Sequence, residues 1–297
     1  MRIGIDLGGT KIEGIALGAN GRELLRMRVP SPQNSYERTL DAIASVVNDI
    51  ESRLGLIGSV GVGIPGTVSP ATGLVKNSNS TWMNGQPLAE DLPRLLQRPL
   101  RFANDANCFA LSEATDGAGA GARVVFGVIL GTGTGGGIVA DGKVLTGPNA
   151  IAGEWGHNPM PAPKDDEWPG PRCYCGRTGC IELFLSGPGL ARDYASEGGG
   201  QAAAVEIAQR AAGGDAIAAH CLARYEDRLA RALSGVINIL DPDVIVLGGG
   251  MSNVERFLTR VPAIWRAHVF SDAVATRLVR AVHGDSSGVR GAAWLWE

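Results

Sequence analysis

Apolar and polar positions alternate at the N-terminus, and this alternation predicts β-strands. Apolar residues occupy every second position from Ile3 to Leu7, a Gly-Gly pair interrupts the run, and residues 12–17 resume it. Asn20-Gly21 then gives a strong hairpin signal. The first 30 residues therefore predict a strand, a glycine turn and two further strands.

Longer runs predict alternating helices and strands in the rest of the first half. Residues 40–54 carry apolar side chains at spacings of three and four, which predicts a helix. SVGVGIPG, at 59–66, predicts a buried strand that ends in a turn. LRFAND, at 100–105, predicts a strand with Asn104 and Asp105 at its carboxyl end, where ligands bind in open α/β sheets.

A second copy of the opening pattern begins near Val124. GIDLGGTKIEGIALGANGR starts at Gly4 and GVILGTGTGGGIVADGK starts at Gly127, and both give a strand, a Gly/Thr turn, a second strand and a hairpin signal. Two copies this far apart predict two related lobes and not a solenoid. Chance similarity between glycine-rich hairpins is the alternative.

The second half predicts a loop followed by helices and a buried strand. Residues 158–172 are rich in proline and polar residues. An apolar stripe over 222–240, ended by Asp241-Pro242, predicts a long core helix. VIVLGGG, at 244–250, predicts a buried strand and a glycine turn. The C-terminus predicts a helix, a short strand at 278–282 and a final helix over 286–297.

Composition excludes several classes of protein. The 297 residues are 44% hydrophobic and 19% charged, with a net charge of −3 and no basic block, so we expect a soluble globular protein that binds no nucleic acid. The N-terminus lacks signal-peptide features, and no apolar run reaches the ~20 residues that span a bilayer. We therefore predict a cytoplasmic protein without a membrane partner.

Two glycine turns are candidates for binding the phosphates of a nucleotide. The first turn, at residues 6–11, lies between two strands, so it is neither a Walker loop nor a Rossmann fingerprint. Its amides and its Thr and Lys side chains can face phosphate oxygens, and the preceding Asp can hold Mg²⁺ through water. A tight hairpin with a solvated lysine explains this turn equally well. The second turn, at residues 131–137, and the glycine run at 248–250 could complete a triphosphate clamp across a cleft. Packing of a helix against the strand also explains the glycine run. The predicted ATP and Mg²⁺ residues are Asp6, Gly8, Gly9, Thr10, Lys11, Thr132, Gly133, Thr134, Gly135, Gly249 and Gly250.

Three cysteines within eight positions indicate a metal site. Cys173, Cys175 and Cys180 offer three thiolates and His157 an imidazole, a closed tetrahedral set typical of structural zinc. The first cysteine pair is more closely spaced than usual, so the bare pattern also admits three unmetallated thiols. Metal binding could order such a proline-rich segment outright.

Five motifs, in order along nearly the whole chain, resemble the ROK family of sugar kinases and repressors. They are DLGGTK, PGTVSP, NDAN, GEWGH and CYCGRTGCIE. NSNSTWMNGQP, LDPDVIVLGGGMSN and HGDSSGVRGAAWLW further resemble the bacterial fructokinase/mannokinase branch. The resemblance implies an α/β fold with two RNase-H-like lobes of the actin/hexokinase type around a central cleft, and a homodimer. We expect an N-terminal lobe at 1–118, completed by the helix at 286–297, and a C-terminal lobe at 119–285.

The resemblance also assigns roles to residues that position alone leaves open. From position, Asp105 is better explained as the N-cap of a helix over 106–118; the resemblance makes it the catalytic base. His157 would bind zinc through one ring nitrogen and a sugar hydroxyl through the other. The implied sugar-binding residues are Gly66, Thr67, Asn79, Asn104, Asp105, Glu154, His157 and Glu182.

The function expected from these motifs is ATP-dependent phosphorylation of a hexose. We expect fructose, or also mannose, to react at the C6 hydroxyl, with Asp105 as general base. An N-acetylglucosamine or glucose kinase is the alternative within the family. A ROK repressor is disfavoured because its helix-turn-helix would precede DLGGTK, where this chain has a strand from Arg2. A non-catalytic sugar-binding or zinc-stabilised protein is disfavoured by the retained acids and glycine turns.

Overall fold

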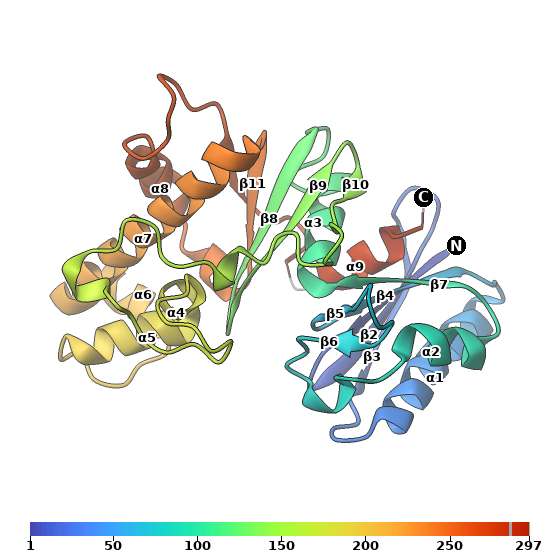
Figure 1. The fold of residues 1–297 in the computed structure, drawn as a ribbon. Coiled ribbons are helices and arrows are strands. Elements are labelled where there is room, and N and C mark those ends of the chain that lie inside the picture. The colour runs from blue at the N-terminus through green and yellow to red at the C-terminus, as the bar shows by residue number, and fades with distance from the viewer. Residues whose placement is uncertain (285–286, 297) are drawn as a thin grey trace. The chain divides into compact units, whose positions relative to one another are not determined.

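The computed structural model describes residues 1–284 and 287–296. The chain forms two compact units (Figure 1). The first comprises Met1–Gly121, Gly137–Ala152 and Val282–Glu297, and the second comprises Ala122–Gly136 and Gly153–Ala281. Relative to the expected lobes, residues 137–152 group with the first unit.

A five-stranded mixed sheet forms the centre of the first unit. Its strands are β1 (Arg2–Leu7), β2 (Lys11–Leu17), β3 (Glu23–Pro30), β4 (Ser59–Ile64) and β7 (Leu100–Asn104), in the order β3-β2-β1-β4-β7. The first three strands are antiparallel neighbours, while β4 and β7 run parallel to β1. The opening strand, turn and hairpin predicted from alternation are therefore present. A small hairpin of β5 (Thr67–Val68) and β6 (Val75–Lys76) follows β4.

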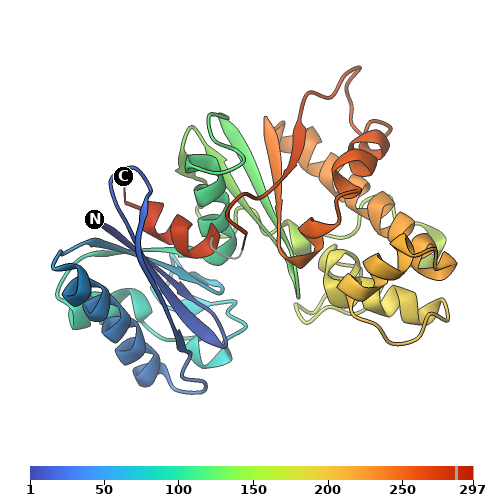
Figure 2. The ribbon, with the colours of Figure 1, turned by 180° about the vertical axis from the view of Figure 1, so that it is seen from behind.

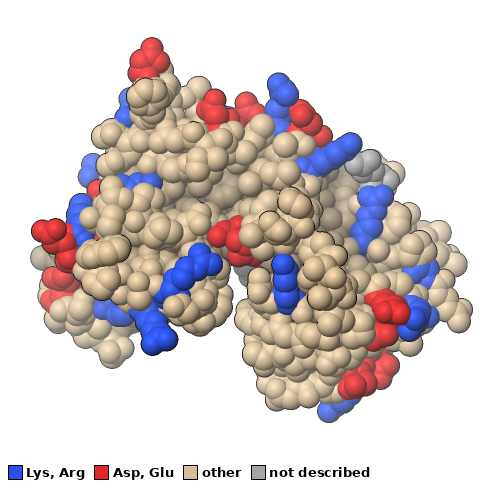
Figure 3. Space-filling view, viewed as in Figure 1, with Lys and Arg blue, Asp and Glu red and all other residues tan. Residues whose placement is uncertain are grey.

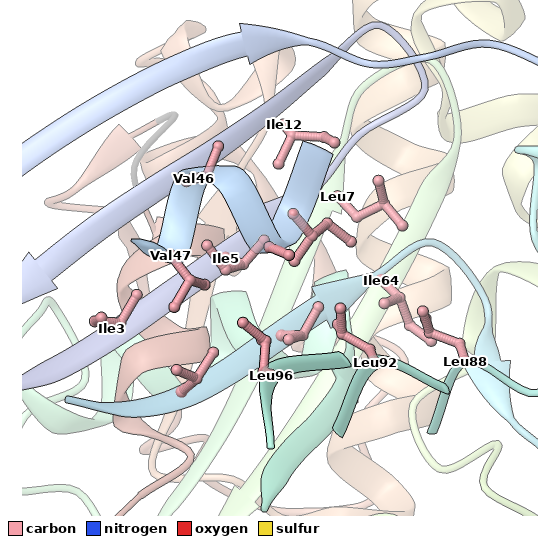
Figure 4. Packing of buried hydrophobic residues seen from close by; sticks show 14 of the residues in the cluster. Ile3, Ile5, Leu7, Ile12, Val46, Val47, Ile64, Leu88, Leu92 and Leu96 are labelled. Atoms are coloured by element: carbon pink, nitrogen blue, oxygen red, sulfur yellow. The ribbon is translucent and has the colours of Figure 1, made fainter. Parts of the chain in front are cut away.

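Helices cover both faces of this sheet. On one face lie α1 (Tyr36–Leu54) and α2 (Leu88–Leu96), and on the other α3 (Asp105–Thr115) and α9 (Ser287–Trp294) (Figures 1 and 2). Ser35 caps the start of α1 by accepting the Arg38 N–H, and Gly55 ends it in the left-handed conformation. The predicted apolar face of α1 is buried against the sheet together with α2 (Figure 4). The final helix, predicted over 286–297, is observed at Ser287–Trp294, and the predicted residues 286 and 297 lie outside the described part of the chain.

A second mixed sheet has the same strand order. Its strands are β8 (Val124–Leu130), β9 (Thr134–Ala140), β10 (Lys143–Val144), β11 (Val244–Gly248) and β12 (Arg277–Arg280), in the order β10-β9-β8-β11-β12. As in the first sheet, the two later strands run parallel to the first strand of the copy. The internal repeat in the sequence therefore corresponds to a repeated sheet, and chance similarity does not explain it.

Five helices belong to the described part of the second unit. They are α4 (Glu182–Leu185), α5 (Gly187–Ser196), α6 (Ala204–Ala212), α7 (Ala216–Leu240) and α8 (Phe257–Trp265). The predicted stripe on α7 is buried from Leu222 to Leu233, and Asp241 ends the helix in the left-handed conformation. Short 3₁₀ turns include Thr81–Met83, Trp155–His157, Asp165–Glu167 and Gly250–Asn253. Within residues 1–284 and 287–296, no helix is both long and apolar enough to cross a membrane.

Close backbone approach holds α9 against the first sheet. A Cβ atom at Gly4 of β1 would lie 2.0 Å from the Val289 carbonyl oxygen, and one at Gly61 of β4 would lie 2.0 Å from the Ala292 carbonyl oxygen. Neither contact is with a flexible side chain, so a methyl group at either glycine must displace the helix. The sheet can bind this helix only where two neighbouring strands lack side chains.

We predict that Gly61→Ala lowers the free energy of unfolding by about 1–3 kcal/mol or more, because it overpacks this contact. Thermal unfolding measures the change. Gly235→Ala is the matched control, because its Cβ would meet no atom within 4 Å inside α7, where alanine is the better helix former by about 0.5–1 kcal/mol. Equal melting temperatures for Gly61→Ala and the wild type would show that α9 is not held by this contact.

Candidate functional site

The first glycine turn is a tight hairpin that ends beside a buried acid. The Gly8 N–H donates to the Lys11 carbonyl at 2.9 Å and so closes the turn itself. The Lys11 ammonium lies 3.5 Å from the buried Glu13 carboxylate. Of the predicted phosphate donors, the Gly8 amide is thus used within the turn, and Lys11 is paired with an acid.

Asp6, at the end of β1, has a strongly perturbed pKa. Burial raises the pKa of this carboxyl from 3.8 to about 7, and the charges of Asp105 and Glu13 add to the increase, while Lys11 opposes it. Gly288 of α9 lies close by, since a Cβ there would be 3.4 Å from Asp6 Oδ2. Neighbouring carboxylates repel one another when ionised. A hard divalent cation bound between them would offset this repulsion.

Asn104, and not Asp105, caps helix α3. The Asn104 side-chain oxygen accepts the Ala106 N–H at 2.9 Å, and its Nδ2 donates to the Gly66 carbonyl at 3.0 Å. Asp105 is the first residue of the helix and is exposed, with Oδ1 2.8 Å from the Ala106 nitrogen. The cap interpretation of Asp105 is therefore wrong, because the preceding asparagine takes that role. An exposed carboxylate remains at the carboxyl end of β7.

Three predicted sugar-binding residues of the first unit have different surroundings. Gly66, with φ +73°, lies so close to the next segment that a Cβ would be 2.3 Å from the Lys76 carbonyl oxygen, so a glycine is required here. Thr67 follows in β5. Asn79 is exposed between two buried serines. A hydrogen bond thus joins Gly66 to Asn104, whereas no such contact ties in Asn79 among the described residues.

In the second unit, the glycine turn between β8 and β9 holds Glu182. The Thr134 N–H donates to Glu182 Oε2 at 3.0 Å, and a Cβ at Gly133 would lie only 2.6 Å from the same oxygen. The observed position of the Glu182 carboxylate therefore requires glycine at position 133. Thr134 Oγ1 is buried and has no hydrogen-bond partner among the described residues.

The same turn holds two further predicted segments. The Gly135 carbonyl accepts the Trp155 indole N–H at 3.0 Å, which places the GEWGH segment against β9. Gly249, with φ +77°, lies against the end of β8, where a Cβ would be 2.4 Å from the Leu130 carbonyl oxygen. Gly250 has no atom within 4 Å of a Cβ position. Residues predicted separately for nucleotide and for sugar binding therefore meet at one turn.

His157, Cys173, Cys175 and Cys180 form one cluster. Their ligand atoms all lie within 4.8 Å of one another, with His157 Nδ1 3.7 Å from Cys173 Sγ and Cys175 Sγ 3.6 Å from Cys180 Sγ. Left-handed glycines at 176 and 179 allow the short loop to fold back. Three thiols and one imidazole within this span are a donor set that fits zinc.

An ionic cluster that the sequence analysis missed holds the proline-rich loop. Glu167 is buried and accepts hydrogen bonds at 2.8 Å from Arg228 and Arg231 of α7. Arg231 also donates to the carbonyl oxygens of Pro161 and Ala162 at 2.7 and 2.9 Å. Burial acts to raise the pKa of Glu167, but the hydrogen bonds from Lys164 N–H and the two arginines bring it below its usual value. Arginines three residues apart on one face of the predicted helix were the available signal.

Tyr174 is a second residue that sequence analysis missed. Its hydroxyl oxygen lies 3.0 Å from His157 Nε2, the nitrogen that the resemblance reserves for a sugar hydroxyl. Glu154 is exposed at the start of the turn that carries His157. The hydroxyl thus contacts one of the predicted sugar-binding residues of this unit.

Comparison with solved structures supports the fold over the full chain. The ROK hexokinase from Thermus thermophilus superposes with a TM-score of 0.87 at 30% identity, over 99% of this chain and 96% of that one. A ROK family glucokinase from Streptomyces griseus, in complex with glucose and AMPPNP, gives a TM-score of 0.78 at 28% identity, over 99% and 98%. The predicted fold class is confirmed.

Sequence comparison agrees over the same length. The chain is 43% identical over 302 residues to the N-acetyl-D-glucosamine kinase of Shigella boydii serotype 4 (strain Sb227), covering 99% of each chain. The family model described as "ROK family" matches residues 2–297. The chain therefore belongs to the ROK family, as its motifs predicted.

Proposed function

We propose that this protein is an ATP-dependent kinase of N-acetyl-D-glucosamine. The observation that carries the proposal is the 43% identity, along the whole chain, to an N-acetyl-D-glucosamine kinase. Fructose was the first expectation from the sequence, and N-acetylglucosamine the alternative. The relatives support the alternative better, so fructose specificity is not retained.

Asp105 is the proposed general base. A sugar hydroxyl must lose a proton as it attacks the terminal phosphoryl group, and a carboxylate within hydrogen-bond reach accepts it. Asn104 supports this role, because it caps α3 and leaves Asp105 exposed at the carboxyl end of β7. We propose the C6 hydroxyl as the attacking group. Gly66, whose carbonyl accepts a hydrogen bond from Asn104, and Thr67, the residue after it, are proposed to bind the sugar beside this base.

ATP and Mg²⁺ are the proposed co-substrate and its metal ion. The neighbour from Streptomyces griseus was solved with AMPPNP, and this chain has the matching chemistry. Asp6 is a partly buried carboxylate whose pKa is raised, and a bound cation would favour its ionised form. Thr134 contributes a buried hydroxyl that lacks a partner within the described residues, and a phosphate oxygen can supply one. Gly9 and Thr10 of the first turn, and Thr132, Gly133 and Gly135 of the second, are the remaining proposed donors.

Zinc is the proposed structural metal, held by the three thiolates and the His157 imidazole. Bound there, it would fix the cysteine loop that leads directly into Glu182. Glu154 and Glu182, with His157, are the proposed sugar-binding groups of the second unit. Glu182 Oε2 is already committed to the Thr134 N–H, so this carboxylate comes to the sugar in a fixed position.

A cytoplasmic homodimer that binds neither nucleic acid nor membranes stays a prediction. On the face shown in Figure 3, lysine and arginine side chains are interspersed with acids and form no continuous basic stripe. This distribution is in keeping with a small-molecule substrate.

For the sugar, we predict that N-acetyl-D-glucosamine gives the highest kcat/KM in a panel with glucose, fructose and mannose. Sites that read polar groups of a substrate can discriminate by as much as about 10⁴-fold, and we expect at least about 100-fold over fructose. A coupled ADP-release assay measures the panel. A preference for fructose would overturn the proposed substrate but leave the kinase activity in place.

For the base, we predict that Asp105→Asn lowers kcat by about 10²–10⁴-fold and changes sugar affinity by no more than about 3-fold. The amide preserves shape and removes the proton acceptor. Asp41→Asn, at an exposed position of α1, is the control and should match the wild type. Near-normal turnover in Asp105→Asn would remove this residue from the mechanism.

For Asp6, we predict a pH-dependent gain in stability for Asp6→Asn in buffer free of Mg²⁺ and nucleotide. The pKa of Asp6 is raised to about 7 in the folded protein, so the folded state holds this proton more tightly than the unfolded state. The wild type therefore loses stability, relative to the variant, as the pH rises from about 4 to about 7. The melting temperature of Asp6→Asn should exceed that of the wild type by more at pH 8 than at pH 5. An equal difference at both pH values would contradict the raised pKa.

For zinc, we predict one metal ion per chain and an effect of chelation that is confined to the cysteine loop. Chelation should open the peptide bonds after Arg172 and Arg177 to trypsin and abolish sugar binding. The bond after Lys164 should stay protected, because the Glu167 ion pairs hold that part of the loop.

Glu167→Ala is the converse test of the loop. It should expose the bond after Lys164 while the protein keeps its zinc, because the cysteine loop has its own ligands. Mass spectrometry of the fragments and zinc analysis measure both results. Cleavage at all three bonds on chelation alone, or full activity in zinc-free protein, would contradict the assignment.

A further inference from the structure

Tyr174 lies in the sequence between Cys173 and Cys175 of the candidate metal site, and its side chain contacts the histidine of that site, His157. Tyr174 is 82% exposed, yet its hydroxyl oxygen is 3.0 Å from His157 Nε2. The two rings meet edge to face, with centroids 5.2 Å apart and planes at 86°. A largely exposed side chain is thus held against the His157 ring.

The two nitrogens of His157 have separate partners. Nδ1 faces the thiols, 3.7 Å from Cys173 Sγ, and is therefore the nitrogen directed to the metal position. When a histidine gives one nitrogen to a metal, the other carries the proton and donates it to an acceptor. With a metal on Nδ1, the acceptor of the Nε2 proton would be the Tyr174 oxygen, 3.0 Å away, and the phenol proton would point away from His157.

A sugar hydroxyl has the same hydrogen-bonding capacity as this phenol, since both accept one hydrogen bond and donate another. Glu154 and His157 lie on one turn, and Glu182 follows the last cysteine of the loop that carries Tyr174. The phenol oxygen therefore contacts one of the three side chains that we propose to bind the sugar, on the loop that joins the other two.

We propose that the Tyr174 hydroxyl takes the place of a sugar hydroxyl on His157 Nε2 in the free protein and that the bound sugar displaces it. This inference rests on the proposed function. Displacement is feasible because Tyr174 is largely exposed and the sugar hydroxyl can take over its hydrogen bond to the imidazole. Tyr174 is thus a built-in competitor that sets the affinity for the sugar.

The test is Tyr174→Phe, which removes the competing oxygen and keeps the ring. One hydrogen bond corresponds to roughly a 5-fold change in an equilibrium constant, so the dissociation constant and KM for N-acetyl-D-glucosamine should fall by up to about 5-fold. kcat should not change, because Tyr174 leaves before the reaction. Calorimetric titration with the sugar alone gives a readout that is independent of turnover.

Tyr194→Phe is the matched control in the same unit. It removes the hydroxyl that donates to Asp215 at 2.9 Å, away from the cysteine loop, and should leave the sugar KM unchanged. The zinc content of both variants should equal that of the wild type. This comparison separates a specific effect at His157 from a general effect of losing a phenol.

Two results would overturn the inference. Weaker sugar binding by Tyr174→Phe would make the hydroxyl a direct sugar contact, and an unchanged dissociation constant would show that it does not compete. In either case the wild type still phosphorylates the sugar, so the proposed function stands. If the wild type neither binds nor phosphorylates any hexose of the panel, the proposed function and this inference fail together.

Discussion

The candidate site residues of the second unit depend on close backbone approach at the β8–β9 turn. Gly133 leaves room for the Glu182 carboxylate, and Gly136 leaves room for Trp155, whose ring atoms would lie 2.7 Å from a Cβ at that position. Gly249 likewise lets the third glycine run lie against the end of β8, where a Cβ would be 2.4 Å from the Leu130 carbonyl oxygen. A turn with side chains at these positions would separate all three segments. The cluster of glycines therefore has one physical reason, the convergence of several chain segments on a single turn.

In the first unit, the corresponding constraint is electrostatic. Asp6 lies near the end of β1 and Asp105 directly follows β7 in the same sheet, and the charge of Asp105 helps to raise the pKa of Asp6. Such an arrangement is unfavourable for the protein alone and favourable once a cation is bound. Natural sequences retain unfavourable local charge where a ligand offsets it. The raised pKa of Asp6 is thus a structural reason, separate from any resemblance, to expect a metal-bound phosphate nearby.

Much of the fold was predictable from the sequence, because the local periodicity of apolar residues indicates each helix and strand. The alternation before Gly8, the three-and-four spacing of α1 and the repeated hairpin each gave the observed element. Contacts between distant segments were not predictable in this way. No local pattern pairs Glu167 with Arg231 across 64 positions, and none indicates that Tyr174 folds back onto His157. The capping of α3 by Asn104 shows the same limit, since adjacent Asn and Asp residues are equally good caps and only the contact to Gly66 separates them.

The candidate site residues were predicted mainly from motifs, and the motifs did not give the sugar that the relatives favour. Sugar preference depends on which polar groups line the pocket, and these come from several loops whose conformation periodicity does not describe.

The ion pairs of Glu167 with Arg228 and Arg231 also limit the part of the chain that the proposed metal would have to stabilise. The sequence presents residues 158–172 as a proline-rich loop, which the predicted zinc site would have to order. The structure gives this loop an anchor of its own, because Arg231 donates to the carbonyl groups of Pro161 and Ala162 without any metal ligand. The proposed zinc would then be needed only for the cysteine loop, where it would hold His157 and the chain that leads to Glu182 together. A metal confined to that task would orient the proposed sugar-binding groups, while the ion pairs of α7 stabilise the loop before them.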